Sequence, residues 1–529
     1  MSSAIIKYNG HLTPSDPLHQ PVLIIGQPRN LSKISFDDVK SKLDPRVGEE
    51  VFKAAVASLH PSPTDSCSMY LNLATLAALP TKCSRHNTPS HAHSLTKLVK
   101  SLSAGVDEYV VIVCERQDVF ASGCAVARAF PVFSRKSGLQ QQQGSSQQPH
   151  TVTVEFLLVD SGGGRPLGDS DLRCLSATAE GIQLTAKIVD TPCQDMNTEA
   201  FIKACGSEIE HVGNALGLKP TIIKGEELNS RGFGGMYSVG RAATHPPALV
   251  VLSHTPEGSQ DTIAWVGKGI VYDTGGLCIK TKTAMCGMRE TAVGAAGFWG
   301  LLRSCQAWAG FSDNLHAIFC LAENAVGPNA IRPDDIITMY SGKTVEINNT
   351  DAEGRLVVGD GVAYAHKDLK ANIIVDMATL TGAQGIATGK YHAAVVTNSS
   401  EWEELCVRSG IVSGDLIHAM PFAPELHFSE FASALADMKN SVADRNNAQP
   451  SCAGLFICSH LGFEFPGIWM HIDMAYPVHC GERATGYGVA LLLTLFGHCS
   501  KNPLLKELSS CCSINGTDVE SATKKIRLV

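Results

Sequence analysis

The sequence lacks the features that mark secreted, membrane-spanning or zinc-finger proteins. Its longest apolar run, VALLLTLF at 489–496, is far shorter than the 18 or so residues of a membrane span. The first residues, MSSAIIKYNGHLTPSD, contain no apolar core of signal-peptide length. None of the 18 cysteines forms a CxxC pair, so a structural zinc site has no supporting spacing. We therefore expect a soluble cytoplasmic protein with reduced thiols and no membrane partner.

Several common catalytic signatures are missing too. The sequence has no HExxH, GxSxG or P-loop motif, so the commoner zinc, serine and phosphate chemistries lack support. Lys and Arg number 43 against 51 Asp and Glu, and the formal net charge of −8 argues against a nucleic-acid partner. GFGGMY at 232–237 resembles a dinucleotide-binding turn, but Tyr237 stands at the third glycine position. A tight turn explains it better than a dinucleotide-dependent enzyme does.

The length of 529 residues predicts two or three structural units. We expect an N-terminal α/β domain over 1–170, with a Gln/Ser-rich loop near 138–149 that has no apolar face to bury. Apolar residues at helical spacing predict a linker helix over 171–190, which ends at a proline. A catalytic domain over 191–512 and a polar tail over 513–529 complete the chain.

The larger domain alternates apolar runs with helical stretches. The predicted strands are 248–252, 262–272, 315–321, 372–377, 393–397 and 469–473, and the predicted helices include 292–306, 356–366 and 401–409. Strands that are apolar throughout, separated by helices, are typical of a mostly parallel sheet covered on both faces. The predicted fold class is therefore α/β, with a smaller N-terminal and a larger C-terminal α/β domain. The functional residues should collect at the carboxyl ends of the strands.

Two charged clusters follow apolar strands. In GKGIVYDTGGLCIK at 267–280, Lys268 and Asp273 flank an apolar strand, and charges rarely occupy such places unless they are paired or bind an ion. In NTDAEGRL at 349–356, a turn between a strand and a helix carries Asp351, Glu353 and Arg355. Taken alone, this acidic turn is better explained as a helix start, where acids are favoured. Together, the two clusters change that interpretation.

These two stretches resemble the metal-binding motifs of the leucyl aminopeptidase family of dinuclear metallo-exopeptidases. DTPCQDMN at 190–197, ATLTGAQ at 378–384, KNSVADR at 439–445 and HIDMA at 471–475 match further family blocks. ALPTKCSRHN at 79–88 is similar to the animal aminopeptidase-like branch of this family. The resemblance implies a metal-dependent aminopeptidase that hydrolyses N-terminal residues from peptides. It also implies a homohexamer.

The resemblance assigns roles position by position. It implies that Lys268, Asp273 and Glu353 bind one metal and that Asp273, Asp351 and Glu353 bind the other. Lys280 would polarise the substrate carbonyl or stabilise the oxyanion, and Arg355 would hold a bicarbonate-like anion that serves as general base. Met288, Thr379 and Gly382 would help to line the pocket for the first side chain.

The implied chemistry is physically consistent. Two divalent ions, Zn or Mn, roughly 3.5–4 Å apart need shared carboxylates and bring a bridging water close to deprotonation at neutral pH. One metal can also bind the free amine of the substrate, which would explain a preference for N-termini. A lysine binds metal only as a neutral amine, so Lys268 has to lose its proton beside the ions. Lys280 needs the opposite state, a charge that faces the developing oxyanion.

One position departs from the family pattern. Where the family has an aspartate ligand in a block reading like MKxDMGGAA, this chain reads MRETAVGAA at 288–296, with Thr291 at the ligand position. A hard divalent ion binds poorly at a site that lacks an anionic oxygen. Either Glu290 or water substitutes for the ligand, or the protein has lost most turnover and acts as an oligomeric scaffold or regulatory protein. His471, which lies in an apolar run, is interpreted as a hydrogen-bonded core residue and not as a ligand.

Overall fold

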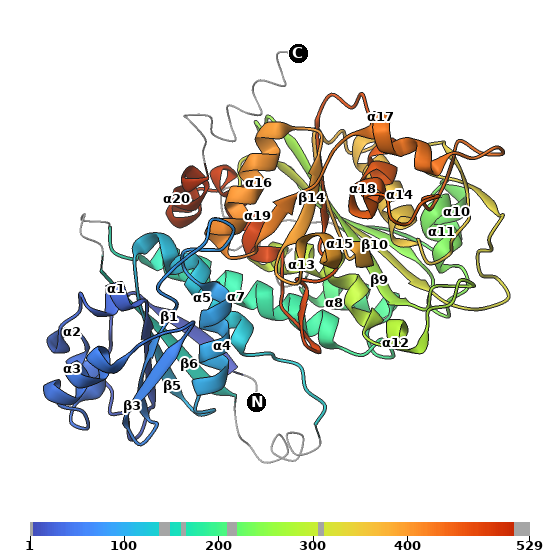
Figure 1. The fold of residues 1–529 in the computed structure, drawn as a ribbon. Coiled ribbons are helices and arrows are strands. Elements are labelled where there is room, and N and C mark those ends of the chain that lie inside the picture. Colours follow the sequence, from blue (N-terminus) through green and yellow to red (C-terminus); the bar gives the residue numbers. More distant parts are fainter. Residues whose placement is uncertain (1–3, 137–148, 160–164, 209–219, 305–310, 513–529) are drawn as a thin grey trace.

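The computed structural model describes residues 4–136, 149–159, 165–208, 220–304 and 311–512, which form two lobes on either side of one long helix (Figure 1). Both lobes are α/β, and the C-terminal lobe is the larger, as the sequence predicts. Most of the predicted Gln/Ser-rich loop, residues 138–148, and the predicted polar tail, residues 513–529, lie outside the described residues.

The N-terminal lobe is built on a six-stranded sheet in the order β1-β6-β5-β2-β4-β3. All neighbouring strands are parallel except β3 and β4, which pair antiparallel at one edge. The central strand VLIIG is buried at every position because helices cover both of its faces. The strands are β1 (Ala4–Asn9), β2 (Val22–Gly26), β3 (Asp65–Tyr70), β4 (Ala74–Ala78), β5 (Glu108–Cys114) and β6 (His150–Leu158), and the helices are α1 (Pro28–Leu31), α2 (Phe36–Leu43), α3 (Glu49–Ser58), α4 (Ala92–Leu102), η1 (Arg116–Asp118) and α5 (Val119–Ala129).

The C-terminal lobe contains an eight-stranded sheet in the order β15-β14-β17-β13-β9-β10-β8-β7. The four central strands β17, β13, β9 and β10 are parallel, whereas β14 and β8 run antiparallel to the strands beside them. All six predicted strands are therefore present, and two of them run against the central direction. The strands are β7 (Pro220–Lys224), β8 (Ala248–His254), β9 (Thr262–Asp273), β10 (Asn314–Asn324), β13 (Ile373–Ala378), β14 (Ala393–Thr397), β15 (Ile417–Ala419) and β17 (Ile468–Asp473).

Helices cover both faces of this sheet because its strands are apolar on both sides. Trp265 faces one cluster of buried side chains and its neighbour Ala264 faces the other. One face is covered by α13 (Val293–Ser304), α16 (Ser400–Ser413), α19 (Val489–Leu495) and α20 (Pro503–Cys511), and the other by α11 (Gly234–Gly240), α14 (Gly354–Lys367) and α18 (Gln449–Ser459). Smaller elements are α8 (Thr198–Glu208), α10 (Glu226–Ser230), α12 (Lys282–Met285), η3 (Met288–Ala292), β11 (Ile336–Thr338), β12 (Thr344–Glu346), α15 (Gly382–Thr388), α17 (Pro424–His427), η5 (Phe428–Phe431), β16 (Met438–Lys439), β18 (His479–Cys480), β19 (Arg483–Ala484) and η6 (Gly497–Cys499).

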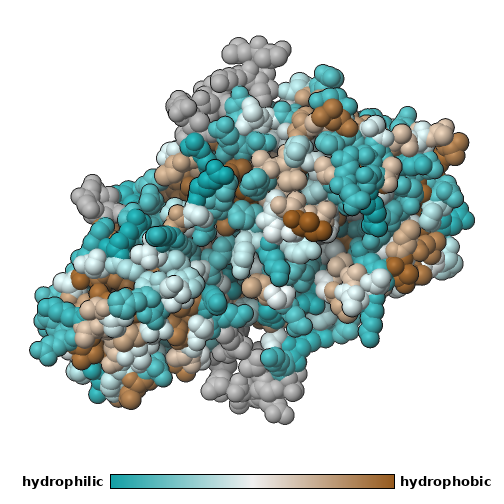
Figure 2. Space-filling model, in the orientation of Figure 1, coloured by the Kyte–Doolittle hydropathy of each residue, from teal (hydrophilic) through white to brown (hydrophobic). Residues whose placement is uncertain are grey.

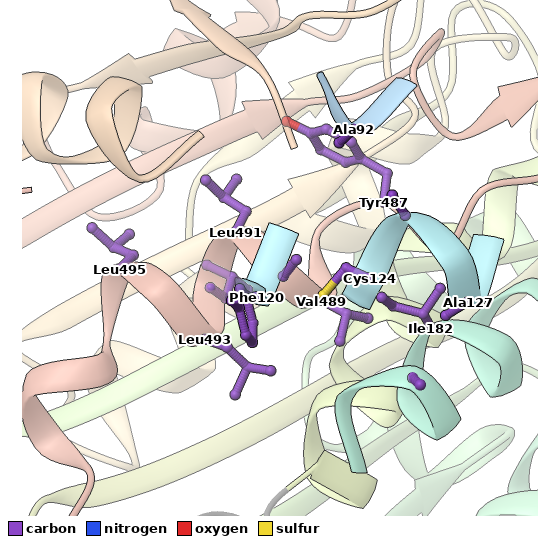
Figure 3. Packing of buried hydrophobic residues seen from close by; sticks show 14 of the residues in the cluster. Ala92, Phe120, Cys124, Ala127, Ile182, Tyr487, Val489, Leu491, Leu493 and Leu495 are labelled. Carbon is purple, nitrogen blue, oxygen red and sulfur yellow. The ribbon is translucent and has the colours of Figure 1, made fainter. Parts of the chain in front are cut away.

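One hydrophobic core runs through both lobes. The helix α7 (Asp169–Asp190) packs against α5 of the N-terminal lobe and α13 of the C-terminal lobe. Phe120 of α5, Ile182 of α7 and Leu491 of α19 belong to the same cluster of buried side chains (Figure 3). The domain limits predicted from the sequence stay a prediction, because this helix belongs to the core of both lobes.

The surface is mixed in character. On the face drawn in Figure 2, hydrophobic residues form several separate patches among hydrophilic ones. Separate exposed apolar residues of this kind are normal on a folded protein. Among the described residues, no helix combines the length and the apolar content that crossing a bilayer would require.

Candidate functional site

The two charged clusters of the sequence meet at one edge of the C-terminal sheet. Lys268 and Asp273 lie on β9, the central parallel strand, and Asn324 ends the neighbouring strand β10. Asp351 and Glu353 lie in the turn that precedes α14, where Glu353 is the residue before the first helical position. This edge collects the carboxyl ends of the parallel strands, where α/β proteins place their sites.

Lys268 connects the clusters from within the core. Its side chain is 3% exposed, and its Nζ lies 2.9 Å from Glu353 Oε1. The same Nζ donates to the backbone oxygen of Thr379 at 2.9 Å. A Cβ at Gly354 would stand 2.7 Å from this amine, so only glycine leaves room for Lys268 here. The turn and the strand are therefore fitted to each other around one buried lysine.

Asp273 is held by donors from three directions. Its Oδ1 accepts from the Gly275 backbone N–H and from Asn324 Nδ2, both at 2.8 Å. Its Oδ2 lies 2.9 Å from Lys280 Nζ. Gly275 has φ +83° and a Cβ there would stand 3.0 Å from Asp351 Oδ1, so the glycine allows the loop to turn beside the carboxylates. Asp273 is thereby fixed in one orientation.

Lys280 lies between the carboxylates of Asp273 and Asp351 and forms an ion pair with each. Burial alone would lower the pKa of Lys280, but Asp273, Glu353 and Asp351 together raise it above its usual value. Lys280 is therefore positively charged throughout the neutral range, which is the state that the family resemblance requires of it.

The three carboxylates form a group with metal-binding geometry. Oxygen atoms of Asp273, Asp351 and Glu353 all lie within 4.8 Å of one another. Burial, with Asp273 close by, raises the pKa of Glu353 to about 7, and burial also raises the pKa of Asp351. Carboxylates that crowd together away from water repel one another unless cations or retained protons offset their charge. Lys268 and Lys280 supply two such charges.

Arg355 lies behind the carboxylates on the first turn of α14. Its Nη1 donates to the backbone oxygen of Asn440 at 3.1 Å, and its Nε is buried without a hydrogen-bond partner. Burial lowers the pKa of Arg355 to about 10, so it stays charged at neutral pH. A buried guanidinium with an unused donor can bind a small anion.

Thr291 does not offer a ligand to the group. Its hydroxyl lies 2.5 Å from the backbone oxygen of Ile270 and 2.7 Å from that of Met288, and it donates to one of them. It is buried beside β9, the strand that carries Lys268 and Asp273. The position therefore lies close to the site but carries no anionic oxygen.

Glu290 pairs with a histidine of another element, and its role as a substitute for the missing ligand stays a prediction. Its Oε2 lies 3.0 Å from His479 Nδ1. The segment is a 3₁₀-helix, in which neighbouring side chains project about 120° apart. Because Thr291 faces β9, Glu290 has to point toward another element, and that element is β18.

The predicted pocket residues lie on two segments beside the site. Met288 begins η3, and the Thr379 side chain donates to the Thr291 backbone oxygen at 3.4 Å. Gly382 begins α15, and apart from its chain neighbours and its own helix backbone, no described atom lies within 4 Å of where its Cβ would be. Both segments border the site, and the lining role of these residues stays a prediction.

Several residues that organise the site have no role that the motifs predict. Asn324 binds Asp273 and also donates to the Thr350 backbone oxygen at 3.1 Å. Asn440 donates to the Asn349 backbone oxygen at 2.7 Å and so holds the turn before α14. Asp473 accepts from the Thr381 hydroxyl at 2.6 Å, which fixes the start of α15. A polar residue at the end of an apolar strand, as Asn324 and Asp473 are, was the available signal.

Comparison with known proteins identifies the family. The model of the "Cytosol aminopeptidase family, catalytic domain" matches residues 183–493, which is more than half of the chain. The chain belongs to the cytosol aminopeptidase family. The model of the "M17 aminopeptidase N-terminal domain 2" matches residues 20–139. This is a family of metalloaminopeptidases, as the sequence motifs predict.

Relatives and solved structures agree with this assignment. The chain is 58% identical over 533 residues to "Probable aminopeptidase NPEPL1" of Homo sapiens, with 100% of each chain covered. It is 46% identical to "Leucine aminopeptidase 1" of Caenorhabditis elegans, with 83% of this chain and 87% of that one covered. A solved structure of leucine aminopeptidase from the same nematode matches with a TM-score of 0.86 and 40% identity, covering 94% of this chain and 99% of that one. Leucyl aminopeptidase from Leishmania major, solved in complex with actinonin, matches with a TM-score of 0.82 and 32% identity, covering 94% and 95%.

Proposed function

We propose that this member of the family removes N-terminal residues from peptides with the help of two divalent metal ions, zinc or manganese. The observation that carries the proposal is the group formed by the buried Asp273 and Glu353 and the half-buried Asp351, whose oxygens lie within 4.8 Å of one another. Oxygen donors clustered in this way suit a divalent cation, and the two lysines beside them are the residues that the family motif pairs with such a group.

The residues present at the site fit two metal ions, but they supply one carboxylate ligand fewer than the motif of the family does. Lys268, Asp273, Asp351 and Glu353 would hold the ions. Thr291 contributes no charge because a hydroxyl is neutral, and its hydroxyl donates to a backbone oxygen. When bound, the ions would bring a water molecule close to deprotonation and attract the free amine of the substrate. We expect the second metal to bind more weakly because one carboxylate is missing.

The chain's own residues would orient the peptide and stabilise the developing charge. Lys280 keeps its proton beside Asp273 and Asp351, so it can donate to the oxyanion that forms on the substrate carbonyl. Arg355 is buried with an unused Nε donor, which supports its role in holding a bicarbonate-like anion as general base. Met288, Thr379 and Gly382 would border the pocket for the first side chain.

The cellular location and the assembly of the enzyme are also part of the proposed function. The family description names a cytosol aminopeptidase, and we propose a cytoplasmic protein that acts on peptides as a homohexamer. Sedimentation of the purified protein gives the mass of the assembly, and a monomer at micromolar concentration would contradict the hexamer.

An activity assay with added Mn or Zn tests the hydrolytic function. Purified wild-type protein is compared with Glu353→Ala on leucine amide and a small set of peptides, and with Glu257→Ala, which removes an exposed carboxylate outside the site. We expect wild type and Glu257→Ala to release N-terminal residues, Glu353→Ala to be inactive, and elemental analysis to find close to two metal ions per chain in wild type.

The same experiment tests the alternative of an oligomeric scaffold. Thr291→Asp restores the carboxylate at the position where the family has an aspartate ligand. If wild type is no more active than Glu353→Ala while Thr291→Asp gains activity, the chain has lost hydrolysis and the scaffold function is favoured. Near-stoichiometric metal in an active wild type would exclude the scaffold.

A further inference from the structure

Glu290 is the neighbour of Thr291, which stands where the family has an aspartate ligand, but it binds a residue more than 180 positions away in the sequence. Its Oε2 lies 3.0 Å from His479 Nδ1, and the two side chains are only 17% and 30% exposed. Glu290 is part of η3 (Met288–Ala292), and His479 begins β18. An ion pair that is largely sheltered from water is screened less than a surface pair.

A second contact ties the same two segments together. Arg289 Nη2 donates to the backbone oxygen of Glu482, at the turn between β18 and β19, at 2.9 Å. Two successive side chains of η3 thus reach one two-stranded hairpin. A 3₁₀-helix of five residues has little stability of its own, so these contacts contribute to holding it in place.

The hairpin itself is firmly attached to the rest of the molecule. Arg483 Nε lies 3.2 Å from Asp190 Oδ2 at the end of α7, and Arg483 Nη2 donates to the backbone oxygen of Phe133 at 2.6 Å. The Ala484 backbone N–H donates to Asp190 Oδ1 at 3.0 Å. The hairpin is therefore a fixed support against which η3 can be held.

On its other side, η3 contacts the segments that build the site. Thr291 is hydrogen-bonded to β9 through Ile270, and Thr379 donates to the Thr291 backbone oxygen. The segment that leads into the hairpin also contacts α15, because the Tyr476 backbone N–H donates to Gln384 Oε1 at 2.9 Å. A shift of η3 toward or away from the hairpin would move Met288 relative to the pocket.

We propose that Glu290 and His479 are positioning residues that hold η3 against the β18–β19 hairpin, so that Met288 keeps its place at the pocket for the first side chain of the substrate. The role of the pocket rests on the proposed function, whereas the fastening of η3 does not. Besides Glu290, the charged group that acts on His479 is Lys390, which opposes the protonated imidazole.

Hydrogen exchange measures the fastening without any substrate or metal. Backbone amides of 286–292 are followed by mass spectrometry in the full-length wild type, in Glu290→Gln and in His479→Gln. The matched control is His245→Gln, which breaks the remote and more exposed pair of His245 Nδ1 with Glu199 Oε2 at 3.2 Å. We expect faster exchange of this peptide in both test variants, by about fivefold or more, and wild-type exchange in the control.

Steady-state kinetics then separates positioning from general damage. We expect KM to rise by about 3–10-fold in Glu290→Gln and in His479→Gln, with kcat and metal content nearly unchanged, because the pocket shifts while the ligands stay. The double variant should be no worse than either single variant, because the two residues act through one contact.

The outcomes distinguish this inference from the proposed function. If exchange at 286–292 is the same in wild type and both variants, the pair does not position η3 and the inference is overturned. Faster exchange with an unchanged KM would overturn the link to the pocket. If no variant, wild type included, hydrolyses any peptide, the proposed function fails, and the exchange data still decide whether the pair fastens η3.

Discussion

Raising the pH should destabilise the metal-free protein through Glu353. Glu353 is 2% exposed, and burial, followed by the nearby Asp273, raises the pKa of its carboxyl group from 4.5 to about 7. In the unfolded chain Glu353 loses its proton near pH 4.5, whereas in the folded protein it keeps the proton until about pH 7. Stability is therefore complete below pH 4.5 and falls between these values. A difference of about 2.5 pH units, at 1.36 kcal/mol each, corresponds to about 3 kcal/mol.

Urea denaturation at pH 5 and pH 8 in the presence of a chelator measures this loss. The comparison is between wild type and Glu353→Gln, which cannot ionise, so that the pH dependence of all other groups cancels in the difference. We expect the free energy of unfolding of wild type to fall by about 2–3 kcal/mol more than that of the variant. Added Mn or Zn should reverse the fall, because a metal binds the ionised carboxylate. Equal pH dependence in the two proteins would refute the reasoning.

Three further substitutions probe the site. Thr291→Asp would direct a carboxylate at two backbone oxygens, so in the presence of a chelator it should lower the free energy of unfolding by about 1–3 kcal/mol. Added metal should raise the Tm of this variant more than that of wild type. An equal rise would place the position outside the metal site. Gly354→Ala would press a methyl group against Lys268 and should cost about 1–3 kcal/mol in urea denaturation, whereas Gly382→Ala, with open space around it, should not. Lys280→Met removes the charge that faces the oxyanion, so kcat should fall about 10²–10³-fold while the metal content stays unchanged. A parallel loss of bound metal would show that Lys280 acts by holding the metal ligands in place.

The α/β class and the central strands could be read from the sequence because each strand is a continuous apolar run between helical stretches. The antiparallel direction of β8 and β14 could not, because a strand that is buried on both faces looks the same in either direction. The direction of a strand depends on which elements its connections join. The pattern of apolar residues in a single sequence does not contain this information.

The sequence indicates which residues come together at the site when their place follows from the ends of strands and the turns beside them. It does not indicate the direction in which a side chain points. Asp273 ends β9, and Lys268 lies within the same strand. Asp351 and Glu353 stand in a turn before α14, so the convergence of the four residues follows from the sheet. The direction of Glu290 depends on η3 being a 3₁₀-helix against β18, which no periodicity over five residues can indicate. The sequence therefore predicts a missing carboxylate at Thr291 but does not indicate which element Glu290 contacts.

The core shared by both lobes has a consequence for synthesis of the chain on the ribosome. Phe120 on α5 (Val119–Ala129) belongs to the same buried cluster as Leu491 on α19 (Val489–Leu495), so part of that cluster lies about 370 residues later in the chain. At about 5–20 residues per second, the ribosome needs roughly 20–70 s to supply it. During that time the emerging N-terminal lobe exposes a hydrophobic surface that its own chain will later bury. Nascent chains stalled before α19 should therefore bind chaperones, and release should coincide with completion of the C-terminal lobe.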